Sequence, residues 1–185
     1  MILEQANPSF ILSHYIDLKV CDNLVKEFDN VGDLANYDKL RGYYRVNDRN
    51  LPSHIIDSYL VELQKCTKLY KDTYPWSYIK NDEWGVMSPF NIQKYPKGEC
   101  YSAEHIEEHG PTKDRMLRHL TFLTYLNDIK EGGETEFILH NLLVKPKKGL
   151  TVIFPAGWTH PHRGHPAPKE EKYITTGWYS YFHRC

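Results

Sequence analysis

The order of hydrophobic and polar positions divides the chain into a helical first part and a strand-rich second part. Apolar residues at the spacing of one helix face predict a helix over residues 17–29 and another from Pro52 to about Leu69. Proline is favoured in the first turn of a helix. Before the first helix, residues 10–16 predict a short strand or entry segment, and the polar, aromatic stretch 37–50 is expected to form an irregular loop or a hairpin.

After Trp84 the pattern changes to short apolar runs that are separated by turn residues. Strands are predicted at residues 90–95, 120–126, 134–139, 142–144, 150–154 and 173–182. Helices followed by such a series of strands favour helices packed against a barrel or a sandwich. We therefore expect a mainly β protein with N-terminal helices, of the α+β class. Residues 1–83 form a helical or lid segment that packs on a core of residues 84–185, and the whole is one compact domain.

Size and charge narrow the class of protein. A chain of 185 residues is long enough for one domain with a real core. Lys and Arg (23) balance Asp and Glu (24), so charge predicts neither nucleic acid nor a membrane as partner. No run approaches the roughly 18 apolar residues of a membrane-spanning helix, and the N-terminus lacks a secretion-signal pattern. The scattered cysteines are typical of reduced thiols, so we expect a cytoplasmic monomer or homodimer.

Three residues could hold a metal ion although they lie far apart in the sequence. His105 and Glu107 are one residue apart, so on a strand both side chains point to one face, and His162 follows much later. Two imidazoles and a carboxylate bind non-haem Fe(II) and leave three adjacent positions for a co-substrate and O2. Taken alone, His-x-Glu is more often a solvated loop, and His160 and His165 compete with His162.

The stretch from His105 to His109 also matches the His-x-x-Glu-His pattern of inverted zinc peptidases. In that pattern two histidines one helical turn apart bind zinc and the glutamate acts as the base. The chemistry requires several turns of helix around the motif. Gly110-Pro111 follows the motif at once, and Pro96-Lys-Gly98 stands shortly before it, so the sequence disfavours a zinc peptidase.

Several motifs in the second half of the chain stand in a characteristic order. They are Arg118-x-Leu-Thr-x-Leu-x-Tyr125-Leu-Asn-Asp128, Gly132-Gly-Glu-Thr-Glu-Phe137, Pro146-Lys-Lys-Gly149 with Val152-Ile-Phe-Pro155, His162-Arg-Gly-His-Pro166 and Lys172-Tyr-Ile-Thr-Thr-Gly-Trp178. In this order and spacing the chain strongly resembles the Fe(II)/2-oxoglutarate dioxygenases of the prolyl 4-hydroxylase type, over roughly Phe90 to Tyr181. The resemblance implies a double-stranded β-helix, or jelly roll, as the core.

By this resemblance, His105, Glu107 and His162 take the positions of the three iron ligands. The family usually has His-x-Asp at the first pair, so Glu107 is a departure, and its longer side chain changes how the carboxylate reaches the metal. Glu108 is the other candidate for this ligand, although a spacing of three residues from His105 suits a strand less well.

The resemblance also implies residues that bind the co-substrate. Lys172, ten residues after His162, takes the position of the cation that pairs with the C5 carboxylate of 2-oxoglutarate. A buried dicarboxylate needs such a cation at the end that the metal does not neutralise. Tyr125 takes the place of a phenol that contacts the same carboxylate, Tyr95 lines the co-substrate pocket, and Thr176 adds a hydroxyl. A solvated position remains the alternative for Lys172, and a place in the core remains the alternative for Tyr125 and Thr176.

Four further residues are candidates for contact with the substrate. Trp178 is expected to pack beside the metal ligands, with a purely structural place in the core as the alternative. Arg41, Tyr43, Tyr44 and the neighbouring Arg45 could belong to a lid, because related enzymes fold a mobile segment over the iron site. An exposed surface loop is the more common explanation for such a stretch.

These features predict an Fe(II)- and 2-oxoglutarate-dependent hydroxylase that forms succinate and CO2, with ascorbate as the reductant. The resemblance implies peptidyl proline as the target and therefore a peptide or protein as the partner. Two alternatives stay open. One is an oxygenase that acts on a free amino acid, a nucleobase or another small molecule. The other is a non-catalytic, cupin-like metal binder that uses His160, His162 and His165.

Overall fold

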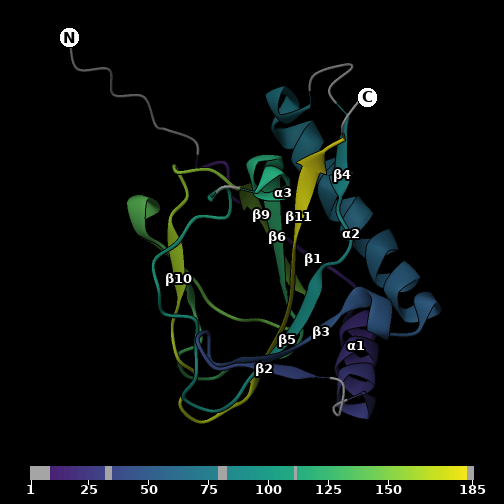
Figure 1. Ribbon diagram of the computed structural model, residues 1–185, viewed down its shortest axis with the longest axis vertical. Helices are drawn as coiled ribbons and strands as arrows, with labels where there is room; N and C mark the ends of the chain where they lie inside the picture. The colour runs from purple at the N-terminus through teal and green to yellow at the C-terminus, as the bar shows by residue number, and fades with distance from the viewer. Residues whose placement is uncertain (1–8, 32–34, 79–82, 111, 183–185) are drawn as a thin grey trace.

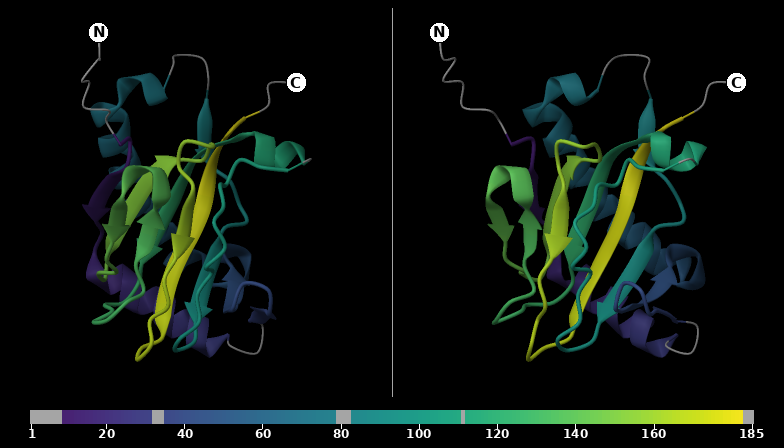
Figure 2. Two further views of the ribbon diagram at one scale, coloured as in Figure 1. Left: turned by 90° about the vertical axis from the view of Figure 1, so that its left-hand side faces the viewer. Right: turned by 60° about the vertical axis from the view of Figure 1, so that its left-hand side comes forward.

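Two antiparallel sheets face each other in the computed structural model, which describes residues 9–31, 35–78, 83–110 and 112–182. The smaller sheet lies opposite the inner face of the larger one, and two long helices cover the outer face of the larger sheet (Figures 1 and 2). This is the arrangement of the expected double-stranded β-helix with helices on one side.

The larger sheet has eight strands in the order β1-β9-β6-β11-β5-β3-β2, and β4 pairs with one end of β11. Their bounds are β1 Leu12–Tyr15, β2 Asn36–Asp38, β3 Tyr43–Asn47, β4 Trp84–Val86, β5 Asn91–Tyr95, β6 Arg118–Tyr125, β9 Leu150–Pro155 and β11 Lys172–Tyr181. The smaller sheet has the order β10-β7-β8. Its strands are β7 Thr135–Phe137, β8 Leu142–Val144 and β10 His162–Gly164.

The two long helices, α1 (Leu18–Asn30) and α2 (Ser53–Thr73), pack their apolar sides on the larger sheet. Asp17 caps α1, because its carboxylate accepts a hydrogen bond from the backbone amide of Lys19 at 2.8 Å. Short helices connect other elements: α3 Lys113–Met116 and the 3-10 turns Asp48–Asn50, Pro75–Ser77 and Ile138–His140. Within the described residues, no helix is long and apolar enough to cross a membrane.

Strand β11 positions both the core and the cavity because successive side chains on a strand point to opposite faces. Tyr173 and Tyr179 point toward the helices and belong to the main core. Lys172, Thr176 and Trp178, at alternate positions, line the cavity between the two sheets. One face of this ten-residue strand therefore packs against the helices, and its other face lines the cavity.

The hydrophobic pattern located both long helices and most strands. Helix α2 extends beyond its predicted end to Thr73, and the stretch 37–50 contains the hairpin β2–β3, one of its two expected forms. The N-terminal segment 1–83 contributes three strands to the larger sheet besides its helices. Strands β4 and β10 were not predicted, because three residues are too few to show an alternation of polar and apolar positions.

Candidate metal centre and co-substrate site

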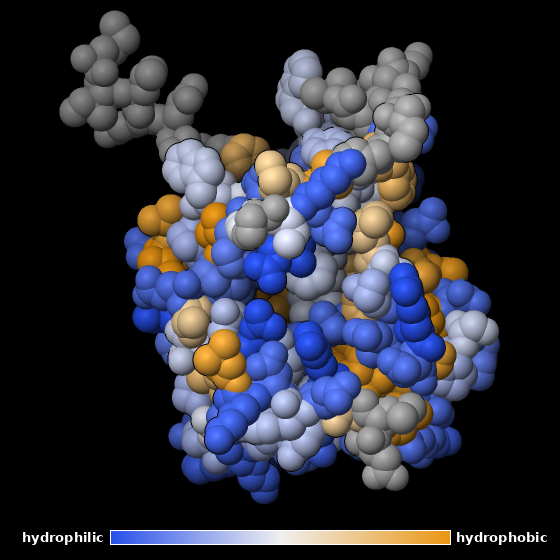
Figure 3. Space-filling view, viewed as in Figure 1, coloured by the Kyte–Doolittle hydropathy of each residue, from blue (hydrophilic) through white to orange (hydrophobic). Residues whose placement is uncertain are grey.

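A cavity of about 490 Å³ opens between the two sheets. Strands β5, β6 and β11 of the larger sheet supply one wall, and β10 of the smaller sheet supplies part of the opposite wall. Figure 3 shows the molecule hollowed near its centre on this face, with mostly hydrophilic residues around the hollow. The volume suits a small ligand, since ligand sites commonly measure about 300–1,000 Å³.

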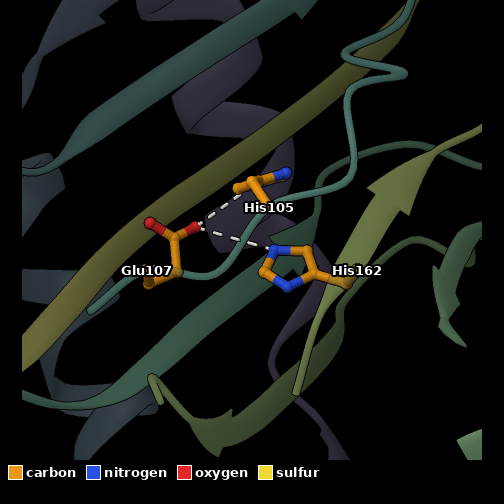
Figure 4. Close-up of side chains that lie close together, drawn as sticks. All are labelled: His105, Glu107 and His162. Carbon is orange, nitrogen blue, oxygen red and sulfur yellow. Dashed lines mark ion pairs between the residues drawn. The ribbon is translucent and has the colours of Figure 1, made fainter. Parts of the chain in front are cut away.

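His105, Glu107 and His162 lie together inside this cavity, as Figure 4 shows. The backbones of His105 and His162 pair with each other, and their amide–carbonyl distances are 3.0 and 2.9 Å. Oε1 of Glu107 lies 3.7 Å from Nε2 of His105 and 3.6 Å from Nε2 of His162. The three ligand atoms lie within 4.8 Å of one another, so one metal ion could contact all of them.

Backbone carbonyls orient both imidazoles toward the shared point. Nδ1 of His105 lies 2.9 Å from the Ala103 oxygen, and Nδ1 of His162 lies 3.0 Å from the His160 oxygen. A carbonyl only accepts, so each Nδ1 carries a proton, and Nε2 is the nitrogen of each ring that faces Glu107 and remains available to a metal. Such outer hydrogen bonds are typical of metal-binding histidines.

The two carboxylate oxygens of Glu107 contact different groups. Oε2 accepts a hydrogen bond from the Trp178 indole at 2.9 Å and lies 3.3 Å from the Arg118 guanidinium, which stacks 3.5 Å from the Trp178 ring centre. Oε1 faces the histidines. Burial alone would raise the pKa of the Glu107 carboxyl, but His105 and His162 outweigh burial and hold this pKa well below its ordinary value. The carboxylate is therefore ionised, the form that a metal requires.

The neighbouring candidates for metal ligands lie elsewhere. Glu108 is exposed and outside the cluster, so Glu107 is the carboxylate that joins the two histidines. The segment around His109 is not helical, so the zinc-peptidase pattern has no helix to support it. His160 bonds to the Ser9 oxygen at 2.8 Å and His165 to Glu136 at 2.8 Å. These contacts separate both from His162, and the three-histidine site of the cupin-like alternative does not form.

Lys172 projects into the cavity from the start of β11 and is 4 % exposed. Its Nζ donates to the Gly133 carbonyl at 3.1 Å and lies 4.8 Å from the centre of the Tyr95 ring. No acidic side chain within the described ranges forms an ion pair with it. Burial lowers the pKa of this ammonium to about 8. A buried cation without a counter-ion suits a ligand that brings its own carboxylate.

The other predicted co-substrate residues differ in their access to the cavity. Tyr95 lines it, and its phenol donates to Gln93 at 2.9 Å. Thr176 also lines it, while its hydroxyl donates to the Phe122 carbonyl at 3.1 Å. Tyr125 does not reach the lining directly. Its phenol is fully buried and donates at 2.6 Å to Thr135, which does line the cavity, so Tyr125 supports the wall from behind.

The substrate candidates divide in the same way. Arg41 and Tyr43 line the cavity, with Arg41 stacked over Tyr101 at 5.5 Å. Trp178 also lines it and bonds to Glu107. Tyr44 points to the other face of β3, where it is 40 % exposed and stacks on Tyr37. Tyr44 therefore lies outside the cavity lining, because adjacent residues on a strand face opposite ways, and its role in substrate contact stays a prediction.

Sequence reasoning assigned no role to Arg118, Gln93, Thr135 and Tyr101, which all line the cavity. Two of them carried a usable signal. Arg118 and Thr135 both lie in motifs that carry the family resemblance. Gln93 and Tyr101 carried none, because Gln93 is one of three polar residues in its predicted strand and Tyr101 lies in a loop outside the motifs.

Residues 90–180 match the model of the 2OG-Fe(II) oxygenase superfamily. These residues form a 2OG-Fe(II) oxygenase domain. The domain includes the whole cluster of His105, Glu107 and His162 together with Lys172. The expected fold class and the expected family are thereby confirmed.

Known proteins similar to the chain include several prolyl hydroxylases and a human procollagen-lysine,2-oxoglutarate 5-dioxygenase 2, which is 25 % identical over 94 % of this chain and 24 % of its own length. A probable prolyl 4-hydroxylase 9 of Arabidopsis thaliana is 34 % identical over an alignment that covers 48 % of this chain and 39 % of the relative. The chain thus spans well under half the length of this relative. A Pseudomonas putida prolyl-4-hydroxylase has a TM-score of 0.72 at 20 % identity and covers 95 % of this chain and 94 % of its own.

A second similar structure contains a bound peptide. It is a prolyl hydroxylase from Trichoplax adhaerens in complex with a hypoxia inducible factor peptide fragment. Its TM-score is 0.68 at 20 % identity, over 97 % of this chain and 87 % of its own. At 20 % identity this likeness shows that the two proteins share a fold.

Proposed function

We propose that the protein is an Fe(II)- and 2-oxoglutarate-dependent hydroxylase that acts on peptidyl proline and produces succinate and CO2. One observation carries this proposal: a His-Glu-His cluster and a buried lysine without an acidic partner among the described residues share one cavity. The first offers ligands for Fe(II), and the second offers the cation that a dicarboxylate needs.

The residues present fit the metal and the co-substrate. Nε2 of His105, Nε2 of His162 and Oε1 of Glu107 would hold the ion, since their Nδ1 atoms and Oε2 already have partners. Lys172 would bind the distal carboxylate, beside Tyr95. Fe(II) with bound 2-oxoglutarate supplies the oxidising chemistry, in which decarboxylation of the co-substrate accompanies hydroxylation of a C–H bond.

The chain itself orients and shields these groups. Trp178 and Arg118 hold one oxygen of Glu107 and thereby direct the other at the histidines. Apolar residues such as Phe154 and Ile174 line the wall and exclude water near the ligands. The peptide target is supported by the prolyl hydroxylases that share the fold, one of which contains a peptide.

Three finer points belong to the same proposal. Ascorbate is proposed as the reductant that keeps iron in the ferrous state. We place the protein in the cytoplasm, a proposal that the reduced state of the described cysteines, Cys21, Cys66 and Cys100, supports. We also propose a monomer or homodimer, which light scattering after size-exclusion chromatography would distinguish.

The test is an assay with purified protein, Fe(II), ascorbate, 2-oxoglutarate and a panel of proline-containing peptides. Succinate and a peptide mass gain of one oxygen atom should appear together, and both should be lost in the His162→Gln variant. Succinate without any peptide product, but with an oxidised free amino acid or nucleobase, would favour a small-molecule oxygenase. No succinate with any substrate would contradict the proposed reaction.

A further inference from the structure

The cavity that holds the metal cluster is rich in arginine. The chain has seven arginines, and five of them line this cavity: Arg41, Arg45, Arg115, Arg118 and Arg163. Lys and Arg together number 23, so 16 residues are lysines, of which Lys172 is in the lining. The guanidinium group is therefore concentrated at the cavity, whereas lysine is spread over the rest of the chain. A guanidinium, with its fixed fork of donors, suits planar carboxylates and phosphates better than an ammonium does.

Two of these arginines lack an acidic partner. Arg41 pairs with Asp38, and Arg163 pairs with Glu136 at 2.7 Å. Arg118 contacts the metal-facing carboxylate of Glu107. Arg45 and Arg115 have no ion pair within the part of the chain that the structure describes. Arg45 is exposed and Arg115 is half-buried, and both residues line the cavity.

The two unpaired arginines reach the cavity from different sides. Arg45 lies on β3 and opposite Gln93 of β5, on the same face of the strand as Tyr43. Arg115 lies in α3, immediately before β6. In Figure 3, mostly hydrophilic side chains surround the hollow. A substrate that enters the cavity therefore meets cationic groups on more than one side.

Binding of metal and co-substrate leaves this positive charge in place. Glu107 is the acidic residue among the described residues of the lining, and it faces the metal. Fe(II) adds two positive charges and 2-oxoglutarate adds two negative charges, so together they leave the net charge of the cavity unchanged. A cleft lined by one sign of charge concentrates the field and attracts ligands of the opposite sign. The charge that remains is thus available to the substrate.

We propose that the substrate is an acidic peptide, in which aspartate or glutamate side chains flank the hydroxylated residue and are bound by Arg45 and Arg115. This rests on the proposed function, whose target it makes more specific. A nucleic acid would need cationic groups along an extended track for its phosphates. Here the arginines gather at one cavity in a chain of formal net charge −1. A basic peptide would be repelled by the same groups.

The test measures binding separately from turnover. Three labelled peptides share one proline and differ only in its neighbours, which are acidic, neutral amide or basic. Fluorescence anisotropy is recorded with Mn(II) in place of iron and with 2-oxoglutarate, at low and at high salt. The acidic peptide should bind roughly tenfold more tightly than the amide peptide at low salt, and this advantage should shrink at high salt.

Variants identify the residues responsible. In the double variant Arg45→Gln/Arg115→Gln, the ratio of the two dissociation constants should fall to about one. The matched control is Arg49→Gln, because Arg49 is exposed, bonds to Ser88 and lies outside the cavity lining. The control should keep the parent ratio. An unchanged ratio in the double variant would overturn the assignment of these two residues.

Two further outcomes separate the inference from the function on which it rests. If all three peptides bind and are hydroxylated equally well, the acidic-peptide inference fails and the hydroxylase remains. If the acidic peptide binds tightest but no peptide is hydroxylated, the specificity of the surface holds and the proposed reaction fails. A last competition experiment compares a single-stranded oligonucleotide with unlabelled acidic peptide as competitors of the labelled peptide. If the oligonucleotide displaces the labelled peptide at the lower concentration, the inference is overturned in favour of nucleic acid.

Discussion

The two faces of strand β11 differ in how fully their buried polar groups are paired. On the helix side, Thr175 donates to Tyr59 at 2.6 Å, and the Tyr179 phenol bonds to Thr67 at 2.7 Å. On the cavity side, the buried ammonium of Lys172 has only a carbonyl partner among the described residues. Thr175 and Tyr179 are paired within the chain, whereas we propose that a ligand completes the pairing of Lys172.

The neighbouring strand shows the same asymmetry. Thr124 of β6 points to the helix side and bonds to Thr151 at 2.8 Å. Thr121 lines the cavity, and its buried hydroxyl has no hydrogen-bond partner within the described part of the chain. Buried polar groups without partners cost free energy, and proteins retain them mainly where function requires them. Substitutions on the two faces should therefore affect different properties, stability on one and ligand binding on the other.

The largest expected effect is the loss of metal binding on the cavity side. His162→Gln keeps most of the side-chain volume but removes the imidazole lone pair, so Fe(II) binding and turnover should both be lost. Calorimetric titration and elemental analysis measure the metal. His165→Gln is the matched control, because this imidazole bonds to Glu136 and lies outside the cluster. Iron at full occupancy in His162→Gln would contradict the ligand assignment.

On the helix side, Tyr179→Ala should lower stability without changing the site. The ring is 1 % exposed and packs on Trp84 and Phe122. Its removal should cost about 3–5 kcal/mol, which lowers Tm by roughly 10 °C for a chain of this size. Thermal unfolding by circular dichroism measures the shift. Metal affinity of the folded variant should equal that of the parent, and a large loss of affinity would mean that the two faces are coupled.

Lys172→Met should move stability and binding in opposite directions. The affinity for 2-oxoglutarate should fall on the order of 100-fold, since the distal carboxylate loses its buried cation. The metal-free protein should gain about 1–3 kcal/mol, because burial of the ammonium no longer opposes folding. Calorimetry and denaturant unfolding measure the two quantities. Loss of both stability and affinity would instead assign Lys172 to the fold.

Trp178→Phe tests how the unusual glutamate is held. The variant keeps an aromatic ring beside Arg118 and removes the hydrogen bond to Glu107. Affinity for Fe(II) should fall about tenfold, as for other groups that orient metal ligands, with little change in Tm. Trp158→Phe is the control, because Trp158 is 76 % exposed and lies outside the cavity lining. Equal metal affinities in the two variants would remove Trp178 from this role.

The smallest expected effect is a pH dependence of co-substrate binding. The pKa of Lys172 in the free protein is about 8, so the ammonium is present below this pH and is lost above it. The dissociation constant for 2-oxoglutarate should therefore rise above pH 8 by up to about tenfold per pH unit. A variant with arginine, Lys172→Arg, stays charged and should show no such rise. A flat profile in the parent would show that Lys172 does not pair with the ligand.

The sequence predicted those parts of the molecule that depend on local pattern. Periodicity located both long helices, and motif order singled out His105, His162 and Lys172, which line one cavity in the structure. The sequence did not decide whether Glu107 or Glu108 is the carboxylate ligand. That choice depends on the path of the loop after His105, whose backbone pairs with His162. The partners of Glu107, Trp178 and Arg118, depend on the register between strands that are distant in sequence.

Two predicted site residues lie outside the cavity lining for physical reasons of the same kind. Tyr44 was placed with Tyr43 at the substrate, but the stretch is a strand, and neighbours on a strand face opposite ways. Tyr125 was expected to touch the co-substrate, yet Thr135 of the smaller sheet stands between its phenol and the cavity. The order of polar and apolar residues within one strand does not predict which residues of the other sheet that strand contacts.

The most direct measurement is an anaerobic titration with Fe(II) and then 2-oxoglutarate, followed by visible absorption. A weak charge-transfer band should appear only when both are present and should saturate at one equivalent of each. The band should be absent in His162→Gln, and Lys172→Met should require on the order of 100-fold more 2-oxoglutarate to reach it. A parent protein that binds neither, or a band that persists in His162→Gln, would contradict the placement of metal and co-substrate on the cavity side of the sheet.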